Sequence, residues 1–190
     1  MSLPTDRDLI VKGLCEIIEG KQLPPDGRVE IAVKGAILGF PATLEAIKTQ
    51  FPFGVTYFIE TDILHQAKSK TDSTLNLTIA PRITRGWLQT LGRLLLFDNK
   101  GKEINNKRFD GAFIAISDDM AKAQRLILYP GMIDRLESLH EYTGFTELHV
   151  RIPQGVVMQQ PTAFDDLDLD VCREAFKLLS EMAQVVFEAF

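Results

Sequence analysis

The stretch PRITRGW holds the residues best suited to bind a ligand. Arg82 and Arg85 lie close in sequence to Trp87, the only tryptophan of the chain. A guanidinium group can bind a carboxylate or phosphate through parallel hydrogen bonds, and an indole ring can stack on a ligand or on an arginine. These three residues predict a site for a small anionic ligand or an enzyme site. The alternative is that Trp87 packs at a sheet edge while the arginines pair with surface acids.

An acidic run made of Asp165, Asp166, Asp168 and Asp170 has the oxygen ligands that a cation site would use. A calcium loop also needs a turn-forming glycine and a distal glutamate. This run has no glycine and leads directly into a predicted helix. We therefore expect the carboxylates to cap that helix and to interact with its positive N-terminal end.

Other residues that could do chemistry are scattered. His65, His140 and His149 show no zinc-binding spacing. Cys15 and Cys172 show no CxxC spacing, so we expect two core residues, with a disulfide between the terminal helices left open. The serines lack a nucleophile-elbow context and the glycines form no nucleotide-binding loop. The sequence predicts no catalytic residue, no metal site and no cofactor, although it leaves the question of an enzyme open.

The composition is that of a globular protein. Hydrophobic residues make up 45% and charged residues 25% of 190 residues, so we expect one domain over residues 1–190. The net charge of -5 argues against a general nucleic-acid binder, which needs a basic face. Charged residues interrupt the apolar N-terminal residues, and no stretch approaches the roughly 18 apolar residues of a membrane span. We therefore expect a cytoplasmic protein.

The elements that must position these residues follow from the hydrophobic periodicity. Helices are predicted from about Asp6 to Glu19, from Ser117 as the cap to Leu128, from about Met132 to Gly144, and from about Asp165 to the end. Strands are predicted at 28–40, 54–63, 75–79, 112–116, 147–152 and 155–159, while 42–51 is ambiguous between strand and helix. Strands grouped between helices favour an α+β fold over alternating β–α–β units. We expect a largely antiparallel sheet, an N-terminal helix, a broken central helix pair and a long C-terminal helix.

Residues 109–160 contain FDGAFIAISDDMAKAQRLILYPGMIDRLESL, followed by the strand pair TELHVRIPQGVVM. The pattern is an aromatic residue, a short strand, an aspartate at a helix start, alanines in that helix, then Leu-x-Pro and a second helix. It resembles the soluble part of an uncharacterised, usually membrane-anchored bacterial domain family. That family has no assigned activity, so the resemblance implies a fold and no function.

Two functional hypotheses follow. The first is a non-enzymatic module that binds a protein partner, or a second copy of itself as a homodimer, through a sheet face, a groove or a helix. A small acidic secretion chaperone is one concrete form. The second is the ligand or enzyme site at Arg82, Arg85 and Trp87, which requires these side chains to converge on a concave pocket.

Overall fold

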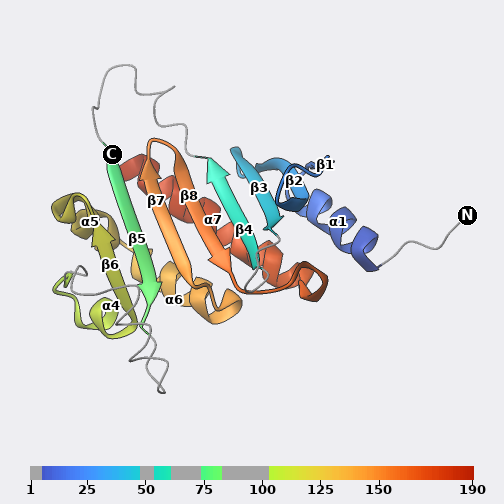
Figure 1. Cartoon of the computed structure of the whole chain (residues 1–190). Helices are drawn as coiled ribbons and strands as arrows, with labels where there is room; N and C mark the ends of the chain where they lie inside the picture. Colours follow the sequence, from blue (N-terminus) through green and yellow to red (C-terminus); the bar gives the residue numbers. More distant parts are fainter. Residues whose placement is uncertain (1–5, 48–53, 61–73, 83–102) are drawn as a thin grey trace, which may run out of the picture.

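The computed structural model describes residues 6–47, 54–60, 74–82 and 103–190 (Figure 1). Its eight strands form one sheet in the order β1-β2-β3-β4-β8-β7-β5-β6, with antiparallel neighbours throughout. The strands are β1 (Lys21–Leu23), β2 (Val29–Ile37), β3 (Phe40–Ile47), β4 (Gly54–Glu60), β5 (Leu75–Pro81), β6 (Phe113–Ser117), β7 (Glu147–Ile152) and β8 (Gly155–Gln160). The helices are α1 (Asp6–Ile17), α4 (Lys107–Ala112), α5 (Met120–Ile127), α6 (Met132–Thr143) and α7 (Leu169–Ala189), with a 3-10 turn η1 (Phe164–Asp166). The predicted α+β fold is confirmed.

The hairpin of β2 and β3 resolves the ambiguous segment near residue 42. Ile37 pairs with Phe40, so Leu38 and Gly39 form a two-residue turn. Both have positive φ, 50° and 84°, which matches the primed turns that follow strand twist. The predicted strand over 28–40 was therefore too long, because Leu38 and Gly39 form a turn within it.

Strands β7 and β8 form a hairpin that lies between β4 and β5. β8 pairs with β4 on one side, and β7 pairs with β5 on the other. The middle of the sheet is therefore built from the strands that come last in the sequence. They join the group β1–β4 to the pair β5–β6 (Figure 1).

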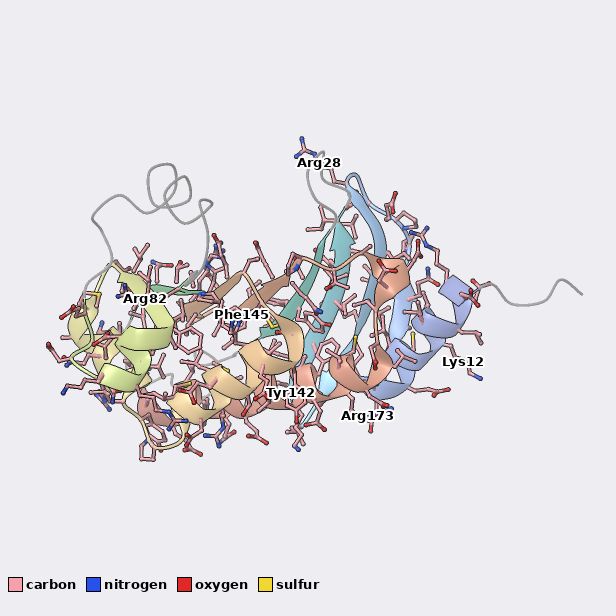
Figure 2. The ribbon with its side chains drawn as sticks, turned by 90° about the horizontal axis from the view of Figure 1, so that it is seen from below. Lys12, Arg28, Arg82, Tyr142, Phe145 and Arg173 are labelled. Carbon is pink, nitrogen blue, oxygen red and sulfur yellow. The ribbon has the colours of Figure 1, made fainter. Side chains whose placement is uncertain are left out.

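One face of the sheet is covered by helices. Figure 2 shows α6, α7 and α1 on the same side of the strands. Along β3, β4 and β7 the inward-facing residues are buried and alternate with more exposed ones, as the period of two requires. In the row that crosses the centre the inward-facing residues are Val33, Leu44, Tyr57, Met158, Leu148 and Ile79. The long helix α7 packs on β4, β8 and β2 and contacts α1, α5 and α6.

Two helix starts differ from their predicted positions. Asp119, not Ser117, caps α5, because its carboxylate accepts the backbone N–H of Lys122 at 3.0 Å. Helix α7 starts at Leu169 rather than near Asp165, because buried Phe164 turns the chain into η1 first. None of the helices in the described residues is long and apolar enough to cross a membrane.

Candidate functional site

Of the predicted ligand site, only Arg82 lies within the described residues. Its backbone N–H donates to the Ala112 carbonyl at 2.7 Å, and its Nε donates to the Phe113 carbonyl at 3.1 Å. The Arg82 guanidinium thus ties the end of β5 to the start of β6. Arg85, Trp87 and His65 lie outside the described residues, so a converging anion site remains a prediction.

The acidic run takes part in helix capping and in an ion pair. Asp168 caps α7 by accepting the backbone N–H groups of Asp170 and Val171, as expected for part of this run. Asp165 instead accepts from Nε of Arg7 at 2.6 Å, and Arg7 also reaches Glu30 at 3.5 Å.

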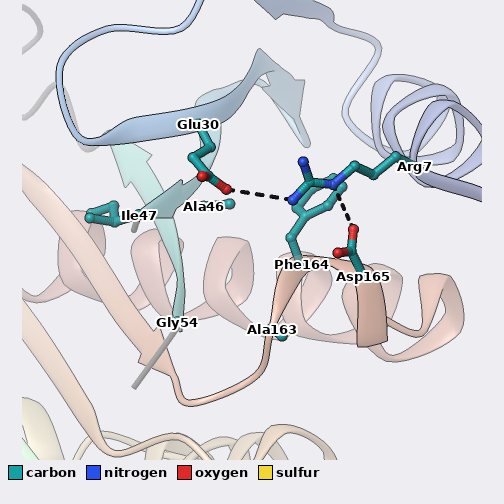
Figure 3. Close-up of a pocket in the computed structure, with 8 residues that line it drawn as sticks. All are labelled: Arg7, Glu30, Ala46, Ile47, Gly54, Ala163, Phe164 and Asp165. Atoms are coloured by element: carbon teal, nitrogen blue, oxygen red, sulfur yellow. Dashed lines mark hydrogen bonds and ion pairs between the residues drawn. The ribbon is translucent and has the colours of Figure 1, made fainter. Parts of the chain in front are cut away.

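The Arg7 pair closes a cavity of about 120 Å³ between α1, the strands and η1 (Figure 3). The Arg7 guanidinium lies 5.9 Å from the centre of the Phe164 ring. Its charge is paired with the carboxylates of Asp165 and Glu30, so Arg7, the cationic residue among the described lining residues, is not free for a ligand. We interpret the contacts of Arg7 with Asp165 and Phe164 as the interaction that holds α1 against η1. The described residues also bring no three metal-ligating side chains together.

A buried polar cluster lies between the sheet and α7. Tyr57 Oη donates to Gln160 Oε1 at 3.0 Å and lies 3.3 Å from Cys172 Sγ. Burial raises the pKa of Tyr57 well above its usual value and also raises the pKa of the Cys172 thiol. Both groups therefore stay protonated at neutral pH, and the cluster positions α7 rather than reacting. Cys15 and Cys172 are free thiols.

His140 packs as an aromatic residue near the end of α6. Its ring lies 5.3 Å from the Phe145 ring and 6.0 Å from the Phe113 ring, both edge to face. Its Nδ1 is buried without a hydrogen-bond partner among the described residues. These contacts belong to the core, so His140 is not a candidate for chemistry.

The opposite side of the sheet, called here the outward face, carries no packed helix from the described residues. It consists of the strand residues that alternate with the buried ones. Strand register sorts its centre into rows: Thr43, Phe58, Val157, His149 and Thr78 form the middle row. Glu60, Gly155, Arg151 and Asn76 form the row beside it. Phe58 and Val157 are half-buried and adjacent, so the centre of the outward face is apolar.

His149 makes two polar side-chain contacts on the outward face. Its Nδ1 lies 3.0 Å from Thr78 Oγ1, and its Nε2 lies 3.1 Å from Glu147 Oε2. Burial lowers the pKa of His149, although the Glu147 carboxylate acts in the opposite direction. The neutral ring then donates from Nε2 to Glu147 and accepts from the Thr78 hydroxyl at Nδ1.

A hydroxyl, an imidazole and a carboxylate are the groups of an acyl-transfer triad. Such a site also needs N–H donors aimed at the developing oxyanion. Around His149, the backbone groups of β5, β7 and β8 are engaged in the sheet ladder. We therefore interpret the His149 cluster as a preformed polar contact and not as a catalytic centre.

Two opposite charges flank a glycine on the outward face. Glu60 and Arg151 are both exposed, and each is the register partner of Gly155, from β4 and from β7. Neither side chain forms an ion pair with another described residue. Gly155 itself contributes no side chain between the two charged groups.

Sequence reasoning missed this face because it depends on register. The alternation in 54–60 and 147–160 showed which residues share a face of one strand. Phe58 and Val157 were a usable signal, since both are apolar at positions opposite the buried set. Which residues are neighbours across strands could not be read from the pattern.

Comparison with known proteins adds no relative. The sequence matches no protein-family model and no curated protein, and the fold matches no solved structure. The resemblance of residues 109–160 to a membrane-anchored family therefore stays a prediction.

Proposed function

We propose that this chain is a protein-interaction module and that the outward face is its binding surface. The observation that carries the proposal is the apolar pair Phe58 and Val157 at the centre of that face. A sheet face that only meets water normally carries polar side chains there. Glu60 and Arg151, without ion-pair partners among the described residues, lie beside this pair. An apolar centre with a polar rim is the usual anatomy of a protein–protein interface.

A cytoplasmic location is part of the proposal. Its support is the pair of free thiols at Cys15 and Cys172, which suits a reducing compartment. The net charge of -5 suits a protein partner better than a nucleic acid.

Site-specific photo-crosslinking in the native cells tests the surface. A photoreactive phenylalanine analogue replaces Gln159, which is exposed on the outward face, or Tyr142, which is 54% exposed on α6. We expect a discrete protein adduct from position 159 and none from position 142, with its composition read by mass spectrometry. Equal adducts from both positions, or none from position 159, would show that the outward face is not the binding surface.

A further inference from the structure

We propose that the outward face binds a second copy of this chain, with a two-fold axis running along β8; this inference rests on the function proposed above. Such an axis sets the β8 strands of the two copies opposite each other. A strand on one side of β8 then faces the partner's strand that lies the same number of strands away on the other side of β8. β4 then faces the partner's β7, and β3 faces the partner's β5. A closed pair of identical surfaces is the commonest form of self-association.

The charges that flank Gly155 carry the inference. Glu60 and Arg151 lie in the same row, one strand away from β8 on either side. The two-fold axis therefore sets Glu60 of each copy opposite Arg151 of the other, which gives two equivalent ion pairs. Stacked sheets lie about 10 Å apart, a gap that a glutamate and an arginine bridge together. Gly155, on the axis, places no side chain between these two contacts.

The next row fits the same arrangement. Val157 lies on the axis and meets Val157 of the other copy. Phe58 and His149 are both register partners of Val157, so each phenyl ring faces an imidazole ring across the interface. Aromatic pairs of this kind add about 0.5–1.5 kcal/mol beyond the burial of their area. Thr43 and Thr78, two strands from β8 on either side, also come to face each other.

No row of this arrangement sets like charges against each other. In the third row, Gln159 lies on the axis, Thr56 faces Glu147, and Glu45 faces Ala80. Because β6 faces the partner's β2, the seven strands from β2 to β6 take part. At about 20 Å long and about 4.8 Å apart they give roughly 670 Å² in projection. A standard interface buries about 800 Å² of accessible surface per partner, and a face with projecting side chains exceeds its projection. The outward face is therefore large enough for a stable dimer.

Charge reversal tests the arrangement by sedimentation velocity of the full chain. Glu60→Arg sets two arginines against each other at both contacts, and Arg151→Glu sets two glutamates. We expect each variant alone to dimerise about 100-fold more weakly, because like charges in an interface cost several kcal/mol. The matched control is Glu141→Arg, which makes the same charge change on exposed α6. It is expected to leave the dimerisation constant unchanged.

Mixing the two variants is the decisive step. A Glu60→Arg chain paired with an Arg151→Glu chain has both contacts attractive, so the mixture is expected to form a heterodimer with close to the wild-type affinity, although each variant alone dimerises about 100-fold more weakly. An effect within one chain cannot produce this rescue. Circular dichroism confirms that each variant folds.

The outcomes separate the two proposals. A wild-type chain that stays monomeric at high concentration overturns the dimer. In that case the crosslinks from position 159 alone test the binding surface. An adduct with a different protein supports the binding surface, and the absence of any adduct contradicts it. A wild-type dimer that neither reversal weakens, or variants that fail to rescue each other, overturns this two-fold arrangement.

Discussion

Adjacent residues of β4 show how differently the two faces of the sheet are built. Tyr57 points inward, is fully buried, bonds to Gln160 and contacts the ring of Phe176 edge to face at 5.1 Å. Phe58 points outward, is half-buried and pairs in register with Thr43 of β3 and Val157 of β8. The inward face is fixed by side chains of several helices, so it determines stability. The outward face carries no helix from the described residues (Figure 2), so we expect it to contribute less to stability.

The largest loss of stability is expected when a large side chain is removed from the core between the sheet and the helices. Phe176→Ala removes a fully buried ring and should lower the free energy of unfolding by about 3–5 kcal/mol, measured by urea denaturation of the monomer. The matched variant is Phe58→Ala on the outward face, with an expected loss of about 1 kcal/mol or less. Equal losses would show that both faces belong to the core.

Removing the Tyr57 hydroxyl should have the next largest effect. Tyr57→Phe leaves the buried Gln160 carboxamide oxygen without its donor, and we expect a loss of about 1–3 kcal/mol in the same assay. Tyr129→Phe removes an exposed hydroxyl that donates to Glu188 at 2.9 Å, and it serves as the control, with no measurable change expected. Similar behaviour of both variants would mean that the buried cluster does not position α7.

Removing the N-terminal cap of α7 should lower the stability of the protein by a smaller amount. Asp168→Ala leaves two backbone N–H groups at the helix start without their acceptor and should cost about 1 kcal/mol of stability. Asp166→Ala changes a neighbouring carboxylate that does not cap the helix, and its urea midpoint should stay at the wild-type value. If Asp166 matters as much as Asp168, the acidic run acts as a unit rather than through one cap.

The smallest effect concerns His149 on the outward face. Its pKa is lower in the folded chain than in the unfolded chain, chiefly because of burial. Below about pH 6.5 the unfolded chain takes up a proton first, so stability falls as the pH decreases until the folded-state pKa is passed. His149→Gln should flatten this part of the stability curve, measured by thermal unfolding between pH 5 and 8. A wild-type curve that is already flat there would contradict the assigned burial.

Local patterns explain why part of the fold could be predicted. The alternation on either side of Pro153 and Gln154 gave β7 and β8 almost to the residue, and Gly131 broke the central helix pair as expected. The cap of α5 was missed because Ser117, Asp118 and Asp119 all have capping side chains, and only the path of the chain out of β6 selects among them.

The candidate face could not be predicted, because its contacts join distant parts of the chain. Thr78 and His149 are 71 residues apart, and neither belongs to a recognisable motif. Their contact exists only because β7 pairs with β5 in one register. A shift by one residue would exchange the two faces.

The two middle strands of the sheet, β7 and β8, come after the other strands in the sequence, and this order matters while the chain is being synthesised. Until residues 147–160 are made, the described strands of the nascent chain form two separate groups, β1–β4 and β5–β6. Each group then presents an unpaired border, β4 in one and β5 in the other, which can recruit other chains. We expect the local hairpins β2–β3 and β7–β8 to close first. Insertion of the second hairpin between the two groups brings together residues about 100 positions apart, so we expect it to be the slower step. Truncation before residue 147 should therefore leave an aggregating fragment rather than a smaller stable protein.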